Sequence, residues 1–438
     1  MRIRPAKRIR GRLSMPGDKS ISHRAAMLAA LAAGASWLRN FSPSQDCAAT
    51  LSCLRQLGVR IEHEGPDVFV ASAGVLSAPA DALDCGNSGT TMRLLAGLLA
   101  GQSFTATLVG DASLQARPMR RIIEPLELMG ARLDSQDGLP PLRVSGNRPL
   151  ASIHYELPIA SAQVKSCILL AALNAEGRTK IVEHTPTRDH TERMLRWFEA
   201  PLAITESTDS SATVIAIEGR RQLVARDVSI PGDISAAAFF IAAAALLPES
   251  DLIINDVGLN PTRTQFLSVL SSLGCDVDTE IIRSECNEPA GTIKVRGLSP
   301  DALGSGDKNE GLVVRGQMIP PLIDELPLLA VVGTQIEGGI EIRDAAELRV
   351  KETDRIAATV ANLRAMGAEV AEYDDGLAVH GPRRLRGATL DPHGDHRVAM
   401  AFAVAALMAE GESELREPDC VAVSFPDFFE RLESIVQR

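Results

Sequence analysis

Six apolar segments rich in small residues recur along the chain, and each follows a polar or glycine-containing turn. The segments cover residues 25–33, 92–100, 167–173, 236–247, 328–332 and 398–408. The turns in front of them begin at Asp18, Asn87, Ser161, Asp233, Asp324 and Asp395. A capping residue followed by a long apolar run predicts a buried helix. Because the turns recur about every 70 residues, the pattern indicates a repeated structural unit.

Each repeat is predicted to contain a second helix and several short strands. The second helix closes in a Leu-rich turn followed by Gly58, Gly130, Gly274 or Gly367, with residues 197–201 as a degenerate copy and 428–435 as the chain end. Glycine also follows several first helices, where we expect it to take a left-handed helix-ending conformation, at Gly34, Gly101, Gly177 and Gly411. Alternating positions predict half-buried strands at 59–64, 67–71, 213–218, 291–296 and 376–380.

Strands that alternate with helices indicate an α/β fold, and six similar units divide naturally into three and three. The Pro16-Gly17 and Pro231-Gly232 pairs break both helix and strand, so we expect the chain to cross there between two lobes. One lobe would span residues 17–231, and the other would combine 232–438 with 1–16.

The charge and aromatic content of the chain argue against nucleic acid as a partner. The chain has 438 residues and a formal net charge of −11, and only 3% of its residues are aromatic. An acidic chain with so few stacking side chains is not expected to bind nucleic acid. Any anionic ligand must therefore be met by a local basic site.

The remaining sequence features predict a reduced, cytoplasmic protein that needs no metal. The seven cysteines are scattered without a Cys-x-x-Cys pair, and no apolar signal region follows the basic N-terminus. The longest apolar run, residues 236–247, is too short to span a membrane. His393 and His396 resemble part of a metal cluster, but no set of partner ligands accompanies them. We expect a monomer.

Cationic and hydroxyl side chains gather at the predicted helix starts, where free N–H groups and the helix dipole favour anions. They include Lys19, Ser20, Arg24, Ser161, Gln163, Lys165, Arg117, Arg188, Lys351 and Arg355. Lys351 and Arg355 are four residues apart, which predicts one helical face. Each residue alone has an ordinary explanation as a solvated helix start or a surface ion pair. Their coincidence in repeated units of an acidic chain favours an anion-binding cleft between the lobes.

Several motifs together resemble the 5-enolpyruvylshikimate-3-phosphate synthase family, with the variant at residues 161–165 and 187–190 closer to its class II subgroup. The motifs are PGDKSISHR at 16–24, GNSGTTMR at 86–93, RPM at 117–119, SAQVKS at 161–166, TRDHTE at 187–192, ELRVKETDR at 347–355 and DHR at 395–397. The match extends from residue 16 to the Ser424-Phe425-Pro426 segment.

This resemblance implies a two-lobe enolpyruvyl transferase fold of six βαβαββ units, closing on 3-phosphoshikimate and phosphoenolpyruvate without metal or organic cofactor. It assigns 3-phosphoshikimate to Lys19, Ser20, Arg24, Ser161, Gln163, Arg188, Asp324 and Lys351. It assigns phosphoenolpyruvate to Lys19, Gly89, Arg117, Gln163, Arg355 and Arg397. Asp324 would be the base for the 5-hydroxyl, and Glu352 would exchange a proton with the methylene group, assisted by Lys19 or His396. General acid and base roles for two carboxyl groups agree with the chemistry of such a transfer.

Two positions, Val423 and Gly89, differ between this chain and some members of the family. Some relatives carry a phosphoenolpyruvate-binding lysine where this chain has Val423, so that contact is not carried over. Gly89 stands where some herbicide-tolerant relatives have alanine, so we expect glyphosate to inhibit this protein.

Two other readings remain open. A UDP-N-acetylglucosamine enolpyruvyl transferase would share the fold, but its relatives place a reactive cysteine just before the Arg-Pro pair, and residues 111–116 contain none. A non-catalytic anion-binding repeat scaffold would not need carboxylates among its cations, yet Asp324, Glu352 and Asp395 stand there.

Overall fold

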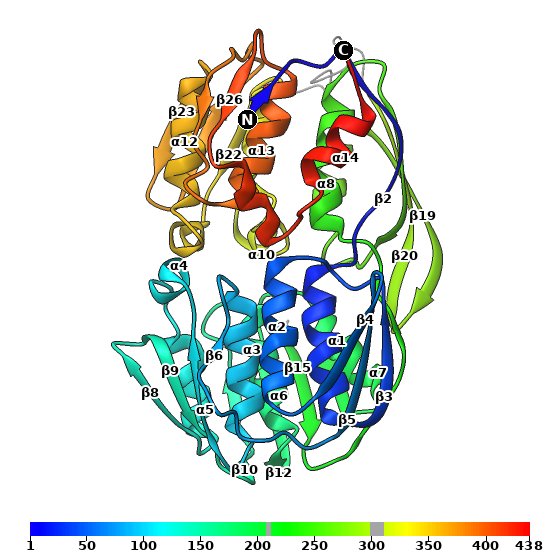
Figure 1. The fold of residues 1–438 in the computed structure, drawn as a ribbon. Coiled ribbons are helices and arrows are strands. Elements are labelled where there is room, and N and C mark those ends of the chain that lie inside the picture. Colours follow the sequence, from blue (N-terminus) through cyan, green and yellow to red (C-terminus); the bar gives the residue numbers. More distant parts are fainter. Residues whose placement is uncertain (207–211, 298–310) are drawn as a thin grey trace. The chain divides into compact units, whose positions relative to one another are not determined.

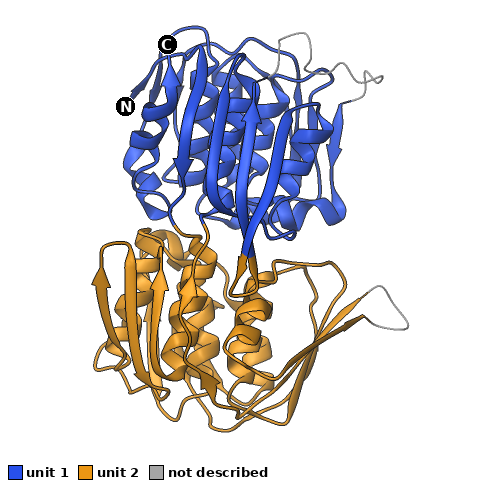
Figure 2. Ribbon diagram, turned by 90° about the vertical axis from the view of Figure 1, so that its right-hand side faces the viewer, with its two compact units in different colours: residues 1–16, 232–283, 289–438 blue, residues 17–231, 284–288 orange. Residues whose placement is uncertain are grey.

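The computed structural model describes residues 1–206, 212–297 and 311–438, and the chain divides into two compact units (Figure 2). Unit 1 comprises Met1–Pro16, Gly232–Arg283 and Pro289–Arg438, and unit 2 comprises Gly17–Pro231 and Ser284–Glu288. Each unit has its own hydrophobic core. The short excursion at Ser284–Glu288 has no signal in the sequence pattern; it belongs to unit 2, where Cys286 packs into the core.

Unit 2 contains three sheets with one shared pattern of strand pairing. In each sheet, the first two strands pair in parallel, and each of the next two strands pairs antiparallel with the strand before it. The first sheet consists of β16 (Leu223–Val224), β3 (Ala32–Arg39), β5 (Asp67–Ala73) and β4 (Arg60–Glu64), with β17 (Val228–Ser229) also beside β3. The second consists of β6 (Leu83–Asp84), β7 (Thr105–Val109), β9 (Leu139–Ser145) and β8 (Arg132–Gln136). The third consists of β11 (His154–Glu156), β13 (Arg178–Glu183), β15 (Thr213–Glu218) and β14 (Leu202–Glu206).

Unit 1 repeats the pattern three times, the last time with one strand fewer. The first sheet consists of β2 (Arg8–Ser14), β18 (Asp251–Gly258), β20 (Glu288–Arg296) and β19 (Asp276–Glu285), with β27 (Val436–Gln437) at the β2 edge. The second consists of β21 (Leu312–Val314), β22 (Ile340–Ile342), β24 (Gly376–His380) and β23 (Glu369–Tyr373). The third consists of β25 (Thr389–Leu390), β26 (Ser413–Leu415) and β1 (Arg2–Ile3). The repeated parallel–antiparallel order confirms the six units predicted from the sequence. A separate pair joins β10 (Leu150–Ala151) and β12 (Ala175–Glu176) in unit 2.

The first helices of the repeats form the buried interior of each unit. They are α1 (Lys19–Leu31), α3 (Gly89–Ala100) and α6 (Ala162–Ala172) in unit 2, and α8 (Ile234–Leu246), α11 (Leu326–Gly333) and α13 (His396–Leu407) in unit 1. Every residue of α8 and α13 is buried. Helices that are apolar or small on all sides are stable only when neighbours surround them, and α8, α11 and α13 pack against one another.

The second helices are amphipathic and cover the sheets. They are α2 (Gln45–Gln56), α5 (Arg120–Leu128), α7 (His190–Trp197), α9 (Gln265–Ser272), α12 (Arg355–Ala365) and α14 (Phe428–Ile435). In unit 2, α1, α2 and α3 contact one another and run side by side (Figure 1). Two further short helices are α4 (Ala112–Gln115) and α10 (Ile319–Leu322).

Polar residues cap five of the six first helices, as the sequence predicts. The side chains of Asp18, Ser88, Ser161, Asp233 and Asp395 each accept a hydrogen bond from a backbone N–H in the first turn. The exception is α11, which begins at Leu326 without a side-chain cap. Asp324 therefore lies in the turn ahead of the helix, where its carboxylate is not used as a cap.

A left-handed glycine ends four of the second helices and none of the first. Gly58, Gly130, Gly274 and Gly367 all have a positive φ between 83° and 97°, and each is followed by the six-residue hydrogen bond of a Schellman motif. Glu199 takes the same place after α7, with φ 61°. For the first helices the predicted left-handed conformation was wrong. Gly101 ends α3 as its C-cap but has φ −88°, and α1 passes directly into β3, so Gly34 lies inside a strand. Gly177 and Gly411 have positive φ, but they lie in the turns that lead into β13 and β26.

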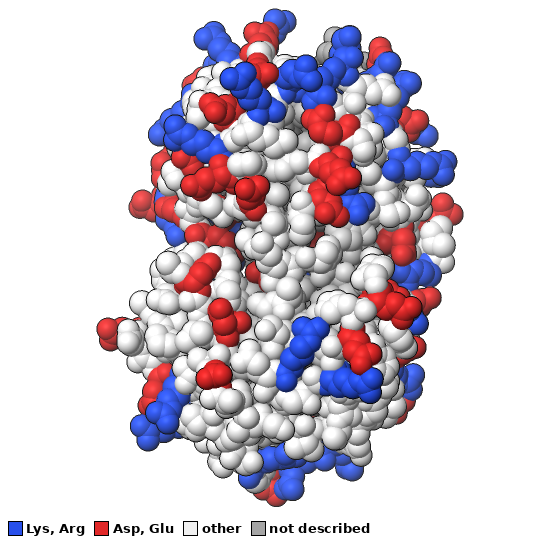
Figure 3. Space-filling view, in the orientation of Figure 1, with Lys and Arg blue, Asp and Glu red and all other residues white. Residues whose placement is uncertain are grey.

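Surface charge and helix length agree with the composition. On the face shown in Figure 3, the acidic and basic side chains of the described residues are interspersed and gather into no continuous field of one sign. Within the described ranges, no helix combines the length and apolarity that crossing a membrane requires. All seven cysteines lie in the described part of the chain as free thiols.

Candidate functional site

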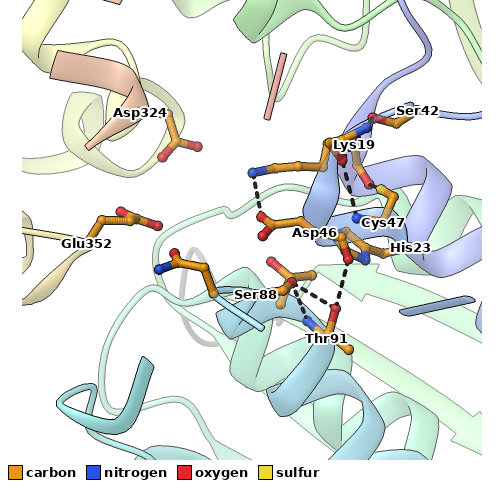
Figure 4. A network of polar contacts seen from close by, with 12 residues as sticks. Lys19, His23, Ser42, Asp46, Cys47, Ser88, Thr91, Asp324 and Glu352 are labelled. Atoms are coloured by element: carbon orange, nitrogen blue, oxygen red, sulfur yellow. Dashed lines mark hydrogen bonds and ion pairs between the residues drawn. The ribbon is translucent and has the colours of Figure 1, made fainter. Parts of the chain in front are cut away.

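Lys19 stands at the start of α1 and is held by a carboxylate of the neighbouring helix. Its Nζ lies 2.9 Å from Asp46 Oδ2 at the start of α2, and both side chains are largely buried (Figure 4). The thiol of Cys47 donates to the carbonyl oxygen of Lys19 at 3.6 Å. The ion pair holds the ammonium group at the start of the helix.

A chain of hydroxyl groups connects the starts of α1, α2 and α3 (Figure 4). His23 Nδ1 lies 2.7 Å from Thr50 Oγ1, which lies 2.7 Å from Thr91 Oγ1, and Thr91 reaches the capping Ser88 Oγ at 2.8 Å. Burial lowers the pKa of His23 well below its ordinary value, and the nearby cations Lys19 and Arg24 lower it further. The imidazole is therefore neutral. This network of hydrogen bonds fixes the position of the α3 N-terminus relative to α1.

Arg24 is buried and its guanidinium is held from three sides. Nε donates to Thr191 Oγ1 at 2.6 Å, Nη2 to Ser166 Oγ at 2.9 Å, and Nη1 to the carbonyl oxygen of Ser20 one turn earlier. Ser20 is the second residue of α1, and Ser161 caps α6. The structure thus brings Ser20 and Arg24 onto one face of α1, as predicted.

Gln163 and Gly89 lie beside two arginines. Gln163 Oε1 accepts from Arg93 Nη1 at 2.8 Å, and its Nε2 donates to Thr90 Oγ1 at 2.9 Å. A Cβ at Gly89 would lie 2.7 Å from Arg93 Nη1 and 3.4 Å from Arg117 Nη1. A side chain at this position would have to displace the Arg93 guanidinium, whereas glycine leaves the backbone at the start of α3 open to a close ligand.

Arg117 is buried in the segment between α4 and α5. Its Nη2 donates to Asn87 Oδ1 at 2.7 Å and to Ser113 Oγ at 3.1 Å. Asn87 belongs to the turn before α3, so the contact joins two of the predicted motifs. Together with Gln163 and Lys19, this arginine surrounds the start of α3 with cationic and amide donors.

Arg188 lies where the sequence predicts, whereas Lys165 has a different environment from the predicted one. Arg188 lies in the partly exposed segment just before α7. Lys165, by contrast, was predicted among the ligand-facing cations but is 1% exposed and paired with Glu183 and Glu192. It is therefore a buried ion-pair residue and does not face a ligand.

In unit 1, Arg355 gathers three carboxylates around one buried guanidinium. Its Nε lies 2.7 Å from Asp395 Oδ2, Nη2 lies 2.6 Å from Glu352 Oε2, and Nη1 lies 3.5 Å from Asp324 Oδ1. Arg355 is 2% exposed, whereas the Asp324 and Glu352 side chains are 19% and 18% exposed. Burial alone would lower the pKa of Arg355, but the carboxylates of Asp395, Glu352 and Asp324 outweigh it and raise the pKa above its ordinary value. The guanidinium therefore stays charged and presents two partly exposed carboxylates.

Lys351 does not share a helical face with Arg355, which corrects the prediction. The short 3-10 helix at Ala346–Val350 ends before Lys351, and α12 begins at Arg355 with Asp354 as its cap. Lys351 Nζ pairs instead with Glu347 Oε1 at 2.8 Å. The residues between the two helices form an irregular turn, and that turn carries Glu352.

Arg397 and His396 open α13 next to the capping Asp395. Arg397 Nη1 lies 3.8 Å from Glu325 Oε1 and donates to the carbonyl oxygen of Ser235 at 3.4 Å. Ser235 Oγ donates in turn to Glu325 and accepts from Arg263 Nη2 at 2.6 Å. His396 is 2% exposed. Val423, which stands where some relatives have lysine, is the last residue of the 3-10 helix Pro418–Val423.

Sequence reasoning missed several residues that hold these side chains. Asp46, Thr91, Ser166, Thr191 and Glu325 belong to no pattern that singles them out, although Thr91, Ser166 and Thr191 lie inside the quoted motifs. Their contacts join residues far apart in the chain, so only the fold reveals them. Among the described residues, no three His, Cys, Asp or Glu side chains are grouped to hold a metal.

Known proteins match this chain over its whole length. The model of the EPSP synthase (3-phosphoshikimate 1-carboxyvinyltransferase) family matches residues 3–432. A 3-phosphoshikimate 1-carboxyvinyltransferase of Koribacter versatilis is 49% identical over 440 residues, covering 100% of this chain and 99% of the relative. One of Synechococcus is 48% identical, covering 99% and 96%.

Solved structures agree with these relatives. The structure of the EPSP synthase of Acinetobacter baumannii matches with a TM-score of 0.84 and 39% sequence identity. The match covers 99% of this chain and 98% of the Acinetobacter chain. The enolpyruvyl transferase NikO of Streptomyces tendae has a TM-score of 0.78 at 20% identity and supports the fold alone. This chain belongs to the EPSP synthase family.

Proposed function

We propose that this protein transfers the enolpyruvyl group of phosphoenolpyruvate to the 5-hydroxyl of 3-phosphoshikimate and releases phosphate, a step of aromatic amino acid biosynthesis. Family membership supports the reaction. The structural observation that carries it is Arg355, a single buried guanidinium that holds the partly exposed carboxylates Asp324 and Glu352. Attack of an alcohol on C2 of phosphoenolpyruvate, an enol phosphate, needs one carboxyl group as base and another as proton donor to the methylene carbon.

Anion recognition is distributed over both units in this proposal. The 3-phosphoshikimate ligands are Lys19, Ser20, Arg24, Ser161, Gln163, Arg188, Asp324 and Lys351. The phosphoenolpyruvate ligands are Lys19, Gly89, Arg117, Gln163, Arg355 and Arg397. Guanidinium groups suit this task because they bind carboxylate and phosphate through paired N–H donors.

The reaction begins with transfer of a proton to the methylene carbon of phosphoenolpyruvate. Glu352 donates this proton, assisted by Lys19 or His396. In the free protein Glu352 pairs with Arg355. A bound phosphoenolpyruvate anion that takes over the N–H groups of Arg355 removes this partner and favours the protonated form of Glu352. Substrate binding thereby prepares the acid.

The 5-hydroxyl then attacks the electrophilic carbon while Asp324 accepts its proton. A carbon–oxygen bond forms, and the intermediate carries both the new ether and the phosphate. When Glu352 takes a proton back from the methyl group, the carbon–carbon double bond forms again and the carbon–oxygen bond to phosphate breaks. Phosphate leaves with the electron pair of that bond and takes up the proton held by Asp324. Cationic side chains stabilise the departing phosphate.

Replacement of Glu352 by glutamine tests this assignment. Glu352→Gln keeps a hydrogen-bonding partner for Arg355 but cannot carry the proton, so we expect turnover to fall by about 10²- to 10⁴-fold. Binding of 3-phosphoshikimate, measured by calorimetry, should stay within about threefold of the unmodified protein.

The matched control is Glu372→Gln, which changes a partly exposed glutamate paired with Arg349 in the same unit. This control should keep full turnover. A Glu352→Gln protein that turns over at the unmodified rate would remove Glu352 from the mechanism.

The protein is further proposed to act as a cytoplasmic monomer on small molecules, without nucleic acid or membrane partners. The acidic composition and interspersed surface charge support this view. Sedimentation at working concentration would reveal any dimer.

A further inference from the structure

A buried ion cluster in unit 2 lies outside the set of proposed ligands. Lys165 Nζ lies 3.1 Å from both carboxylate oxygens of Glu183 and 2.8 Å from Glu192 Oε1. The three side chains are 1%, 5% and 2% exposed. Burial alone would lower the pKa of Lys165, but Glu192 and Glu183 outweigh it and raise the pKa, so the ammonium stays charged.

This cluster joins three elements that follow one another in the third repeat. Lys165 comes from α6, Glu183 from the end of β13, and Glu192 from α7. Buried charges are costly unless each finds an opposite charge, so the three elements can pack only in the arrangement that brings these groups together. The cluster therefore fixes α6, β13 and α7 relative to one another.

The residues next to the cluster hold Arg24. Ser166 follows Lys165 on α6, and Thr191 precedes Glu192 on α7. Their hydroxyl oxygens lie 2.6 Å apart and accept from Arg24 Nη2 and Nε. A shift of α7 against α6 would separate the two hydroxyl groups and release the guanidinium.

The cluster also anchors the segment that carries Arg188. The Thr187 backbone N–H donates to Glu183 Oε1 at 3.0 Å, and the Thr187 hydroxyl donates to the same oxygen. Thr187 is buried, whereas Arg188, the next residue, is partly exposed. The carboxylate thus sets the backbone from which the Arg188 side chain extends.

We propose that Lys165 is a positioning residue that, through Glu183 and Glu192, holds Arg24 and Arg188 in place for 3-phosphoshikimate. This inference rests on the proposed function, which assigns both arginines to that substrate. It concerns binding of one substrate only, since neither arginine is assigned to phosphoenolpyruvate.

The test compares Lys165→Met with the unmodified full-length protein. Removal of the ammonium should raise the KM for 3-phosphoshikimate at least tenfold, while the KM for phosphoenolpyruvate changes less than threefold. A purely structural role would lower the active fraction, and hence kcat, without separating the two KM values.

A second pair of variants decides the question if Lys165→Met fails to fold. Thr187→Val removes only the hydroxyl that donates to Glu183. Thr179→Val is the matched control, because this fully buried threonine of the same strand β13 has no hydrogen-bond partner for its hydroxyl among the described residues. We expect Thr187→Val to raise the KM for 3-phosphoshikimate about fivefold and Thr179→Val to leave it unchanged.

The outcomes separate this inference from the proposed function. An unmodified protein that releases no phosphate with both substrates contradicts the proposed function. A protein that turns over, and whose folded Thr187→Val variant keeps the unmodified KM for 3-phosphoshikimate, contradicts the positioning role alone.

Discussion

Two buried cations, one arginine and one lysine, serve different purposes in this protein. Arg355 in unit 1 and Lys165 in unit 2 are each almost fully buried and surrounded by carboxylates. Around Arg355 two of the carboxylates are partly exposed, whereas both partners of Lys165 are buried. Exposure of the partner, and not the identity of the cation, distinguishes a group that can meet substrate from one that holds the fold.

His23 should make the stability of the protein depend on pH. Its pKa in the folded protein lies well below the ordinary 6.5. Below pH 6.5 the unfolded chain therefore binds a proton that the folded protein does not. Its stabilising contribution is complete above that pH and is lost as pH falls, by at most about 1.4 kcal/mol per unit.

Denaturant unfolding across this range measures the effect. The slope of unfolding free energy against pH should be smaller in His23→Asn, while His380→Asn, at an exposed position, should leave it nearly unchanged. Identical slopes in His23→Asn and the unmodified protein would show that His23 titrates normally.

Gly89→Ala should weaken phosphoenolpyruvate binding and reduce inhibition by glyphosate. The added Cβ would displace Arg93, whose Nη1 donates to Gln163. We expect the KM for phosphoenolpyruvate to rise about tenfold, equivalent to about 1.4 kcal/mol. The glyphosate concentration for half inhibition should rise further, and the KM for 3-phosphoshikimate serves as the internal control. A variant no more resistant than its parent would count against a ligand beside Gly89.

At the scale of the element, the glycines that end the second helices should contribute measurably to the free energy of unfolding. Gly367 has φ 83°, and a Cβ there would meet nothing within 4 Å, so Gly367→Ala tests backbone strain alone. The left-handed conformation costs a non-glycine residue about 1–2 kcal/mol, and the free energy of unfolding should fall by that amount. Glu199→Gly, at the equivalent place after α7, should change stability in the opposite direction. Equal stability of all three proteins would contradict the account of these helix ends.

Elements were predictable where local chemistry decides them. Capping residues such as Ser88 and Asp395, and Leu-rich turns before glycine, act within a few residues. The strands predicted at 213–218 and 376–380 form, but several consecutive residues of each are buried, so the prediction that they are half-buried was wrong. The segment at 351–354 was not predictable, since its polar residues also suit a helix. There Asp354 caps α12 and Glu352 binds Arg355, and both contacts hold the chain outside the helix.

At the scale of the whole molecule, the sixfold repeat was predictable because each repeat buries its own apolar helix. The surroundings of each charged side chain were not predictable, because they depend on residues far away in the sequence. The sequence predicts Lys165 as an available cation, and only the fold shows Glu183 of β13 beside it. Arg24 likewise depends on Thr191, which is 167 residues away in sequence. Motifs therefore identified the candidate residues, and the fold determined which of them are exposed.

The most direct test of the central claim is phosphate release by the purified protein, with 3-phosphoshikimate and phosphoenolpyruvate each omitted in turn. We expect release only when both are present, and without any added metal. Absence of release from the folded protein with both substrates present would contradict the assignment, and UDP-N-acetylglucosamine would then be the next acceptor to test.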